Sequence, residues 1–192
     1  FIRGQDYFDY DAECDLTETR DHYLADRYNS QVLVVGAPNA DFAYLNENQE
    51  SYFREQNNYK QFQSDKSPRD KVIYAGANNG ILHAFDASNG KEIWGFVPPL
   101  IAGKLPTMVN PGLNKRSSGG TVPIFGVDGS PVVHDVFMKM PTSAGQSKEW
   151  NSILMVPYGR GGAGFSVLNV TDPNSPSHLY SCLLYTSDAA DD

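Results

Sequence analysis

Residues 71–98 contain three short strand-forming runs separated by two tight turns, and this arrangement constrains the fold more than any other part of the chain. A β-branched and aromatic run opens the segment, and a second apolar run follows at 81–85, after an Asn-Asn-Gly turn at 78–80. Because these turn residues tolerate positive φ, the pair predicts a hairpin. A second turn at 86–90 leads into a third run at 92–97. Three antiparallel strands in so short a segment make up most of one four-stranded β-propeller blade.

The flanking sequence predicts further short strands. In chain order we expect a strand at 31–37 with a hairpin partner at 42–45, a polar surface insertion at 46–69 with a helical turn at 50–56, a loop at 100–120, two strands within 122–138, and strands at 153–158 and 165–170. Gly36 and Gly76 lie 40 residues apart, near the ~40–45 residues of a four-stranded blade. We interpret this spacing as a blade repeat, which favours a propeller over a sandwich.

The expected fold class is therefore all-β, an incomplete β-propeller of several blades with an acidic N-terminal loop. Residues 1–30 form the lead-in loop and residues 31–181 the partial propeller. Residues 182–192 (CLLYTSDAADD) resemble translated sequencing-adaptor sequence, so we expect this tail to be non-native. Of the two cysteines, Cys182 falls in the tail and only Cys14 remains, so no disulfide framework can be inferred.

The charge of the chain argues against nucleic acid as a partner, and its hydropathy argues against a membrane-spanning segment. The formal net charge of −8 argues against nucleic acid, since phosphate contacts need clustered lysine and arginine. We also expect no membrane span, because no apolar run reaches about 18 residues.

The acidic residues are concentrated at 6–26, where eight carboxylates accompany one basic residue, Arg20. Calcium takes about six to eight oxygen ligands, so carboxylates that alternate along a loop can converge on one ion. The candidate ligands are Asp9, Asp11, Glu13, Asp15 and Glu18. Arg20 stands twelfth from Asp9 and cannot ligate, so the closing carboxylate would come from Glu18 or Asp21. Spacing alone leaves both a calcium site and a solvated acidic face open.

Other conspicuous residues have structural interpretations. We expect Trp94 to be a buried anchor between neighbouring blades, and His83 to be a packing residue rather than a metal ligand or base. The glycine run at 159–164 lacks a following Lys-Ser/Thr and precedes a strand, so it predicts a tight turn and not a phosphate loop. Neither the serine-hydrolase elbow nor the zinc-protease motif is present, and the sequence predicts no enzyme.

Five separated phrases, taken together, resemble one known family. They are FIRGQD, YNSQVLVVGAP, VIYAGANNGILHAFDASNGKEIWGFVP, VDGSPVVHDVF and YGRGGAGFSVLNVTDP. They occur in the order found in the PilY/PilC family, and residues 1 to about 180 are similar to the upstream part of its C-terminal β-propeller. The resemblance implies an exported type IV pilus biogenesis protein and adhesin at the pilus tip, cell surface or outer membrane. Its implied partners are pilins, minor pilins and host or surface receptors.

The same resemblance implies calcium-dependent regulation of pilus extension and retraction. Family members carry an EF-hand-like D-x-D-x-D/N-G loop between the RGQD phrase and the first propeller strand, where this chain has Asp9, Asp11 and the residues that follow. The chain departs from that pattern at Glu13, which replaces a shorter Asp or Asn, and at Cys14, which replaces Gly.

Two alternatives remain at this point. The pattern N-G-x-L-x-A-x-D-A-x-x-G-x-x-x-W at 79–94 is similar to the repeat of quinoprotein propellers, so a dehydrogenase-like propeller dependent on pyrroloquinoline quinone is one alternative. The adjacent cysteine pair of those enzymes is missing, since the cysteines are Cys14 and Cys182. The other alternative is a non-enzymatic outer-membrane scaffold propeller that binds partners and no calcium.

Overall fold

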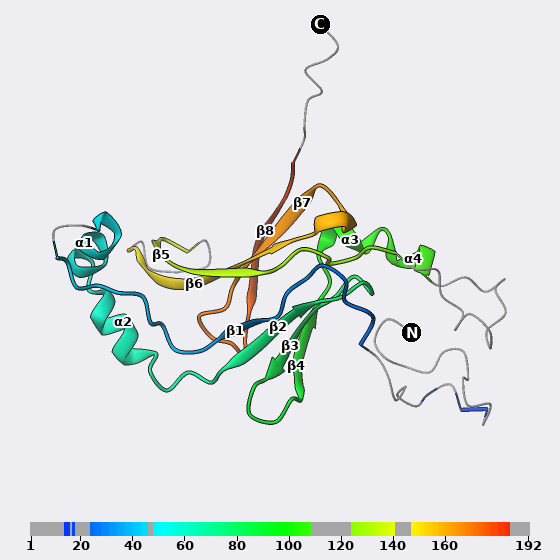
Figure 1. Cartoon of the computed structure of the whole chain (residues 1–192), viewed down its shortest axis with the longest axis horizontal. Helices are drawn as coiled ribbons and strands as arrows, with labels where there is room; N and C mark the ends of the chain where they lie inside the picture. Colours follow the sequence, from blue (N-terminus) through cyan, green and yellow to red (C-terminus); the bar gives the residue numbers. More distant parts are fainter. Residues whose placement is uncertain are drawn as a thin grey trace, which may run out of the picture.

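Two four-stranded antiparallel sheets make up the fold in the computed structural model, which describes residues 14–15, 17, 24–45, 48–108, 124–140 and 147–184 (Figure 1). The strands of the first sheet are β1 Leu33–Val35, β2 Val72–Gly76, β3 Leu82–Asp86 and β4 Glu92–Phe96. Those of the second are β5 Val132–Met138, β6 Glu149–Pro157, β7 Gly164–Asn169 and β8 Ser177–Leu183. Each strand pairs with its neighbours in sequence, so each sheet is one meandering blade. The expected all-β, incomplete propeller is confirmed.

The β2–β3–β4 meander follows the turn chemistry of its sequence. Gly80, with φ +80°, closes the first turn, where the Ala77 N–H donates to the Ile81 carbonyl at 3.0 Å. In the second turn the Asp86 carboxylate accepts from the Ser88 N–H and hydroxyl, both at 2.7 Å, and Gly90 has φ +74°. The hydroxyl and N–H of Ser88 lower the pKa of Asp86. Both predicted turns are confirmed.

The second sheet repeats the construction of the first. Its third strand, β7, carries a register shift at Val167/Leu168, as β3 does at Ala84/Phe85. The turn that follows begins with Asp172, whose carboxylate accepts from the Asn174 N–H at 3.0 Å, as Asp86 accepts in the first sheet. The two sheets are therefore successive blades of one type.

Two expectations for the first blade are wrong. Residues 42–45 form no strand, and β1 pairs instead with β2, in the register Leu33↔Tyr74. Gly36 and Gly76 consequently lie in one sheet, and their spacing is not a blade repeat. The segment between β1 and β2 is the polar insertion, which contains helices α1 Gln49–Gln56 and α2 Tyr59–Asp65. Only the first of these helices was predicted.

Two other segments differ from expectation, and a third agrees with it. Residues 99–108 contain two short helices, α3 Pro99–Ala102 and α4 Leu105–Met108, in place of a loop. The described part of 122–138 contains one strand, β5, where we expected two, because residues 124–131 pass between the blades without strand pairing. The glycine run forms a short 3-10 turn, η1 Gly159–Gly161, which confirms a tight turn.

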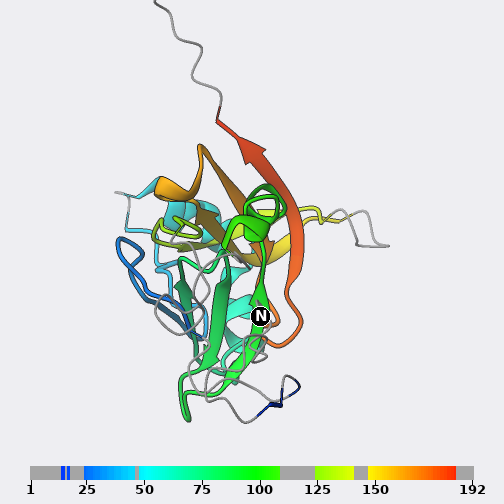
Figure 2. The same ribbon diagram turned by 90° about the vertical axis from the view of Figure 1, so that its right-hand side faces the viewer.

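The main hydrophobic core lies between the two blades. Tyr74 and Leu82 of the first sheet and Leu154 of the second are fully buried there. Trp94 is partly buried rather than buried, yet it does join the blades: its indole N–H donates to the carbonyl of Pro173 at 2.8 Å, and its ring lies 5.6 Å from that of Tyr74. Figure 2 shows β8 running beside β4, where the rings of Phe96 and His178 are 5.3 Å apart.

A second cluster joins the insertion to the second blade. Tyr59 and Phe62 of α2 pack against Trp150 of β6, with ring centroids 4.8 Å and 6.5 Å away. Helices α1 and α2 lie at one end of the molecule and α3 and α4 at the other (Figure 1). Within the described ranges, no helix has the length and apolarity needed to cross a membrane. Strand β8 continues through Cys182 and Leu183, which we expected to begin the non-native tail.

Candidate functional site

The predicted calcium ligands lie mostly outside the described residues. Asp9, Asp11, Glu13 and Glu18 belong to that undescribed part, and Asp15 is the one candidate the structure places. The Asp15 carboxylate accepts from the Thr17 hydroxyl at 2.6 Å and from the Thr17 N–H at 2.8 Å. These hydrogen bonds, the hydroxyl first, lower the pKa of Asp15, which favours the charged form that a cation would bind.

Cys14 has the backbone conformation that the sixth residue of an EF-hand-like loop requires. Its φ is +71°, in the left-handed region where glycine is normally favoured. Cys14 stands sixth when the loop is counted from Asp9. The sharp turn expected of glycine is therefore made here by a residue with a side chain, at a conformational cost of about 1–2 kcal/mol.

The segment that follows this loop is fastened to the first blade. Asn78, in the β2–β3 turn, donates through its backbone N–H to the Asp26 carbonyl at 3.0 Å and through its side-chain amide to the Asp26 carboxylate at 2.8 Å. Asn78 is 5% exposed, so these bonds are shielded on one side. Residue 26 therefore has a fixed position relative to the β2–β3 hairpin.

The same segment is also fastened to the connection at 124–131, which is joined to the second blade where the Asp128 N–H donates to the Tyr158 carbonyl at 3.1 Å. Asn29 donates to the Asp128 carboxylate twice, through its N–H at 3.1 Å and through its side-chain amide at 2.6 Å. The Gln31 N–H adds a bond of 3.0 Å to the Ser130 hydroxyl. Asp128 is only 1% exposed, and a buried carboxylate requires such donors. Residues 26–31 thus connect the lead-in loop to both blades. This junction was not predicted: Asn29 and Asp128 lie in two of the phrases that carry the family resemblance, but nothing in either phrase indicates that the two residues pair.

A polar network fixes the insertion on the second blade. The Tyr59 hydroxyl donates to one oxygen of the Asp135 carboxylate, and the Ser152 hydroxyl donates to the other at 2.6 Å. Arg69 donates to the Ser152 hydroxyl at 2.7 Å and to the Gly36 carbonyl at 2.8 Å. Burial and the neighbouring Asp135 raise the pKa of Tyr59 well above its usual value. The tyrosine therefore remains a hydrogen-bond donor at neutral pH.

His83 is a packing residue, as predicted. It is 3% exposed, its Nδ1 lies 2.6 Å from the Glu92 carboxylate, and its Nε2 lies 3.2 Å from the Asn79 amide. Its ring also stacks on Phe85, with centroids 5.8 Å apart. Within the described ranges, no group of three or more His, Cys, Asp or Glu side chains is placed to hold a metal ion.

Comparison with known proteins identifies the family. The model of the PilY1 beta-propeller domain matches residues 24–191 of the chain. The chain belongs to the PilY1 β-propeller family. The PilY/PilC resemblance seen in the sequence is confirmed, and the match extends across both blades.

Two curated relatives and one solved structure agree with this assignment. A type IV pilus biogenesis factor PilY1 homolog of Xylella fastidiosa is 36% identical over 156 residues, and the PilY1 of Pseudomonas aeruginosa strain PAO1 is 34% identical over 159 residues. These matches cover 81% and 83% of this chain but 11% and 12% of the relatives. The crystal structure of the Pseudomonas aeruginosa PilY1 C-terminal domain matches with a TM-score of 0.50 at 29% identity, covering 78% of this chain and 24% of that one.

The relatives bear on the alternatives kept open by the sequence. Both are named as biogenesis factors of the type IV pilus, which supports a pilus-related role, and neither name refers to a dehydrogenase. The chain spans about a tenth of their length, so their further activities and partners do not transfer with the blade fold.

Proposed function

We propose that this chain is the calcium-responsive start of a type IV pilus propeller, acting in pilus extension as part of a tip-associated, surface-exposed adhesin. The observation that carries the pilus role is the family match over residues 24–191. Pilins or minor pilins would be its partners within the pilus, and host or surface receptors its partners outside.

The calcium part of the proposal is supported by two residues of the loop that the structure describes, Cys14 and Asp15. Asp15 is held in its charged form by Thr17, and Cys14 makes the turn for which an EF-hand-like loop uses glycine. An ion bound by Asp9, Asp11, Glu13, Asp15 and Glu18 would neutralise charges that repel one another. Because residues 26–31 are fastened to both blades, ordering of the loop would stabilise the blade junction.

Calcium titration of the full chain tests this proposal. We expect calcium to release or absorb heat and to raise the melting temperature, and we expect Asp9→Ala/Asp11→Ala to abolish both effects. Cys14→Gly should keep the calcium response, because glycine adopts the left-handed conformation of residue 14 without strain. Equal calcium responses in all three proteins would remove this loop from the mechanism.

The pilus role is tested separately by a chimera. This chain would replace the matching segment of Pseudomonas aeruginosa PilY1 in a strain that lacks its own copy. We expect surface pili and twitching motility to be restored, and the Asp9→Ala/Asp11→Ala chimera to lose the dependence on calcium. A stably expressed chimera that restores neither pili nor motility would contradict the pilus proposal.

A further inference from the structure

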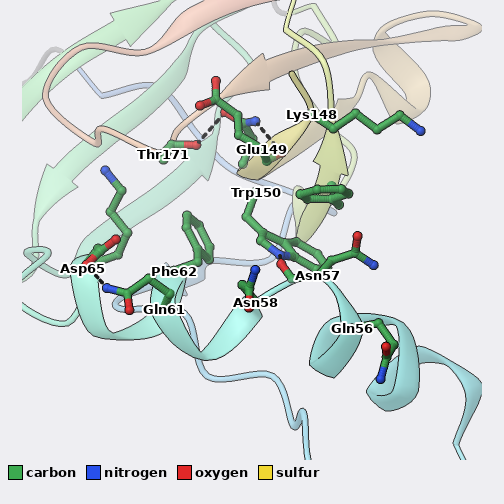
Figure 3. Close-up of a pocket in the computed structure, with 13 residues that line it drawn as sticks. Gln56, Asn57, Asn58, Gln61, Phe62, Asp65, Lys148, Glu149, Trp150 and Thr171 are labelled. Atoms are coloured by element: carbon green, nitrogen blue, oxygen red, sulfur yellow. Dashed lines mark hydrogen bonds between the residues drawn. The ribbon is translucent and has the colours of Figure 1, made fainter. Parts of the chain in front are cut away.

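A cleft of about 670 Å³ opens between helix α2 and strand β6 and belongs to no site described above. Figure 3 shows Asn58 and Gln61 on its helix side, Glu149 and Thr171 on its sheet side, and Trp150 between them. The volume is within the range of small-ligand sites, about 300–1,000 Å³. The cleft lies where α2 packs beside the first residues of β6, Glu149 to Asn151.

The floor of the cleft is aromatic and rigid. The Trp150 ring lies between those of Phe62, 6.5 Å away, and Phe137, 5.3 Å away. The Trp150 indole N–H donates to the Asn57 carbonyl at 2.8 Å, so the ring cannot turn freely. Trp150 is 9% exposed, so the floor presents a ligand with a fixed apolar edge and not an open ring face.

The rim of the cleft consists mainly of neutral amides. On the sheet side, Asn151 is already positioned by Asn169, whose amide donates to it at 2.9 Å. On the helix side, Gln61 donates to Asp65 at 2.7 Å, while the Asn58 side chain has no hydrogen-bond partner among the described residues. Side-chain amides offer both donors and an acceptor, which is the combination that hydroxyl groups need.

The charges around the cleft offset one another. Asp65 and Glu149 contribute two carboxylates, and Lys66 and Lys148 contribute two ammonium groups. A phosphate or other strongly anionic ligand would need an excess of positive charge. The cleft therefore suits an uncharged ligand with many hydroxyl groups.

The backbone around the cleft argues against an extended peptide as its ligand. Strand β6 pairs with β5 on one side and β7 on the other, so it has no free edge to which a peptide strand could add. The opposite wall is the first part of helix α2, which offers no strand edge either. Recognition by strand addition is therefore excluded, and the side-chain amides supply the hydrogen-bonding groups.

We propose that the cleft between α2 and β6 binds a neutral saccharide, with the amides of Asn58 and Gln61 hydrogen-bonding its hydroxyl groups over the Trp150 floor. This site is independent of the calcium loop and of the pilus role proposed above. A site of this kind would give the chain an affinity for uncharged glycans.

Titration of the ¹⁵N-labelled full chain with the methyl glycosides of glucose, galactose, mannose and N-acetylglucosamine tests this. The chain has two tryptophans, and each indole N–H donates to a different carbonyl, so their NMR signals act as site and control. We expect at least one glycoside to shift the Trp150 indole signal saturably while the Trp94 signal stays fixed. Absence of a saturable Trp150 shift with every glycoside would overturn the proposal.

Two variants test whether the amides of Asn58 and Gln61 contact the ligand. Asn58→Gly removes the amide while keeping the left-handed backbone, φ +55°, without strain, and Gln61→Ala removes the second amide from an exposed helix position. Each should weaken binding about threefold to tenfold. Gln49→Ala, on α1 outside the cleft, is the matched control and should bind like the unchanged protein.

Two competing ligands complete the test. Sialyllactose carries a carboxylate and should bind no better than lactose, because the charges of the cleft cancel. An acetylated, amidated Gly-Ser peptide should leave the Trp150 signal fixed. Preference for sialyllactose, peptide binding at Trp150, or unchanged affinity in both Asn58→Gly and Gln61→Ala would each overturn the saccharide proposal.

Discussion

Replacing Asn29 by alanine tests whether the junction at residues 26–31 holds the lead-in to the second blade. The substitution keeps the backbone N–H bond to Asp128 and removes the shorter side-chain bond of 2.6 Å. Asp128 is buried, so its carboxylate loses a donor that water replaces poorly.

The expected cost follows from the character of that bond. A hydrogen bond to a charged group contributes about 1.5–3 kcal/mol, and the lower end applies because Asn29 itself is exposed. A loss of about 1.5 kcal/mol in a chain of this size lowers the melting temperature by about 3–6 °C. Differential scanning calorimetry or urea unfolding measures either quantity.

A neighbouring substitution and a double-mutant cycle provide the controls. Gln31→Ala should be neutral within about 0.5 kcal/mol, because Gln31 bonds to Ser130 through its backbone. In the cycle of Asn29→Ala with Asp128→Ala, we expect a coupling of about 1 kcal/mol or more. An Asn29→Ala protein as stable as the unchanged chain, with no coupling to Asp128, would refute the role assigned to this junction.

Two further predictions concern stability. Gly161→Ala should destabilise the chain by more than about 3 kcal/mol, because a Cβ there would collide with the Gly126 backbone carbonyl. Gly103→Ala is the control and should be neutral, because there is open space around Gly103. Equal urea midpoints for the two variants would contradict this prediction. Burial raises the pKa of Tyr74 from 10.0 to about 12, so the unfolded chain ionises first and stability should fall between pH 10 and 12 by up to about 1.4 kcal/mol per unit. Tyr74→Phe should lose less stability over that range in urea titrations, and parallel losses in the two proteins would exclude Tyr74 as the cause.

The strands that could be predicted are those formed by local signals. The β2–β3 hairpin is specified within a few residues by an Asn-Asn-Gly turn, and the next turn by Asp86 and Gly90. The pairing of β1 could not be predicted in the same way, because its partner follows only after two helices. Residues 42–45 have strand-like composition, but Phe42 packs beside Tyr59 and Trp150 instead. Tertiary packing decided the outcome there.

The candidate sites also divide into those set by local sequence and those set by tertiary packing. The acidic alternation from Asp9 can be recognised in the sequence, because its ligands are close together along the chain. The Asn29–Asp128 junction joins residues 99 apart, and the cleft joins Asn58 and Gln61 to Trp150 of another blade. No pattern in a single sequence indicates such pairs. The i, i+3 spacing of Tyr59 and Phe62 was the one local signal that α2 buries an aromatic face.

The position of helices α1 and α2 has a mechanical consequence. They interrupt the first sheet in sequence, between β1 and β2, and they contact the second sheet through Tyr59 and Trp150. Tension that separates β1 from β2 must also draw on the helices that link them, and α2 is held to the second blade where the Tyr59 hydroxyl donates to the Asp135 carboxylate. The first blade therefore cannot be peeled away strand by strand while the helices stay docked. Under a pulling force the two blades should yield together, in one step.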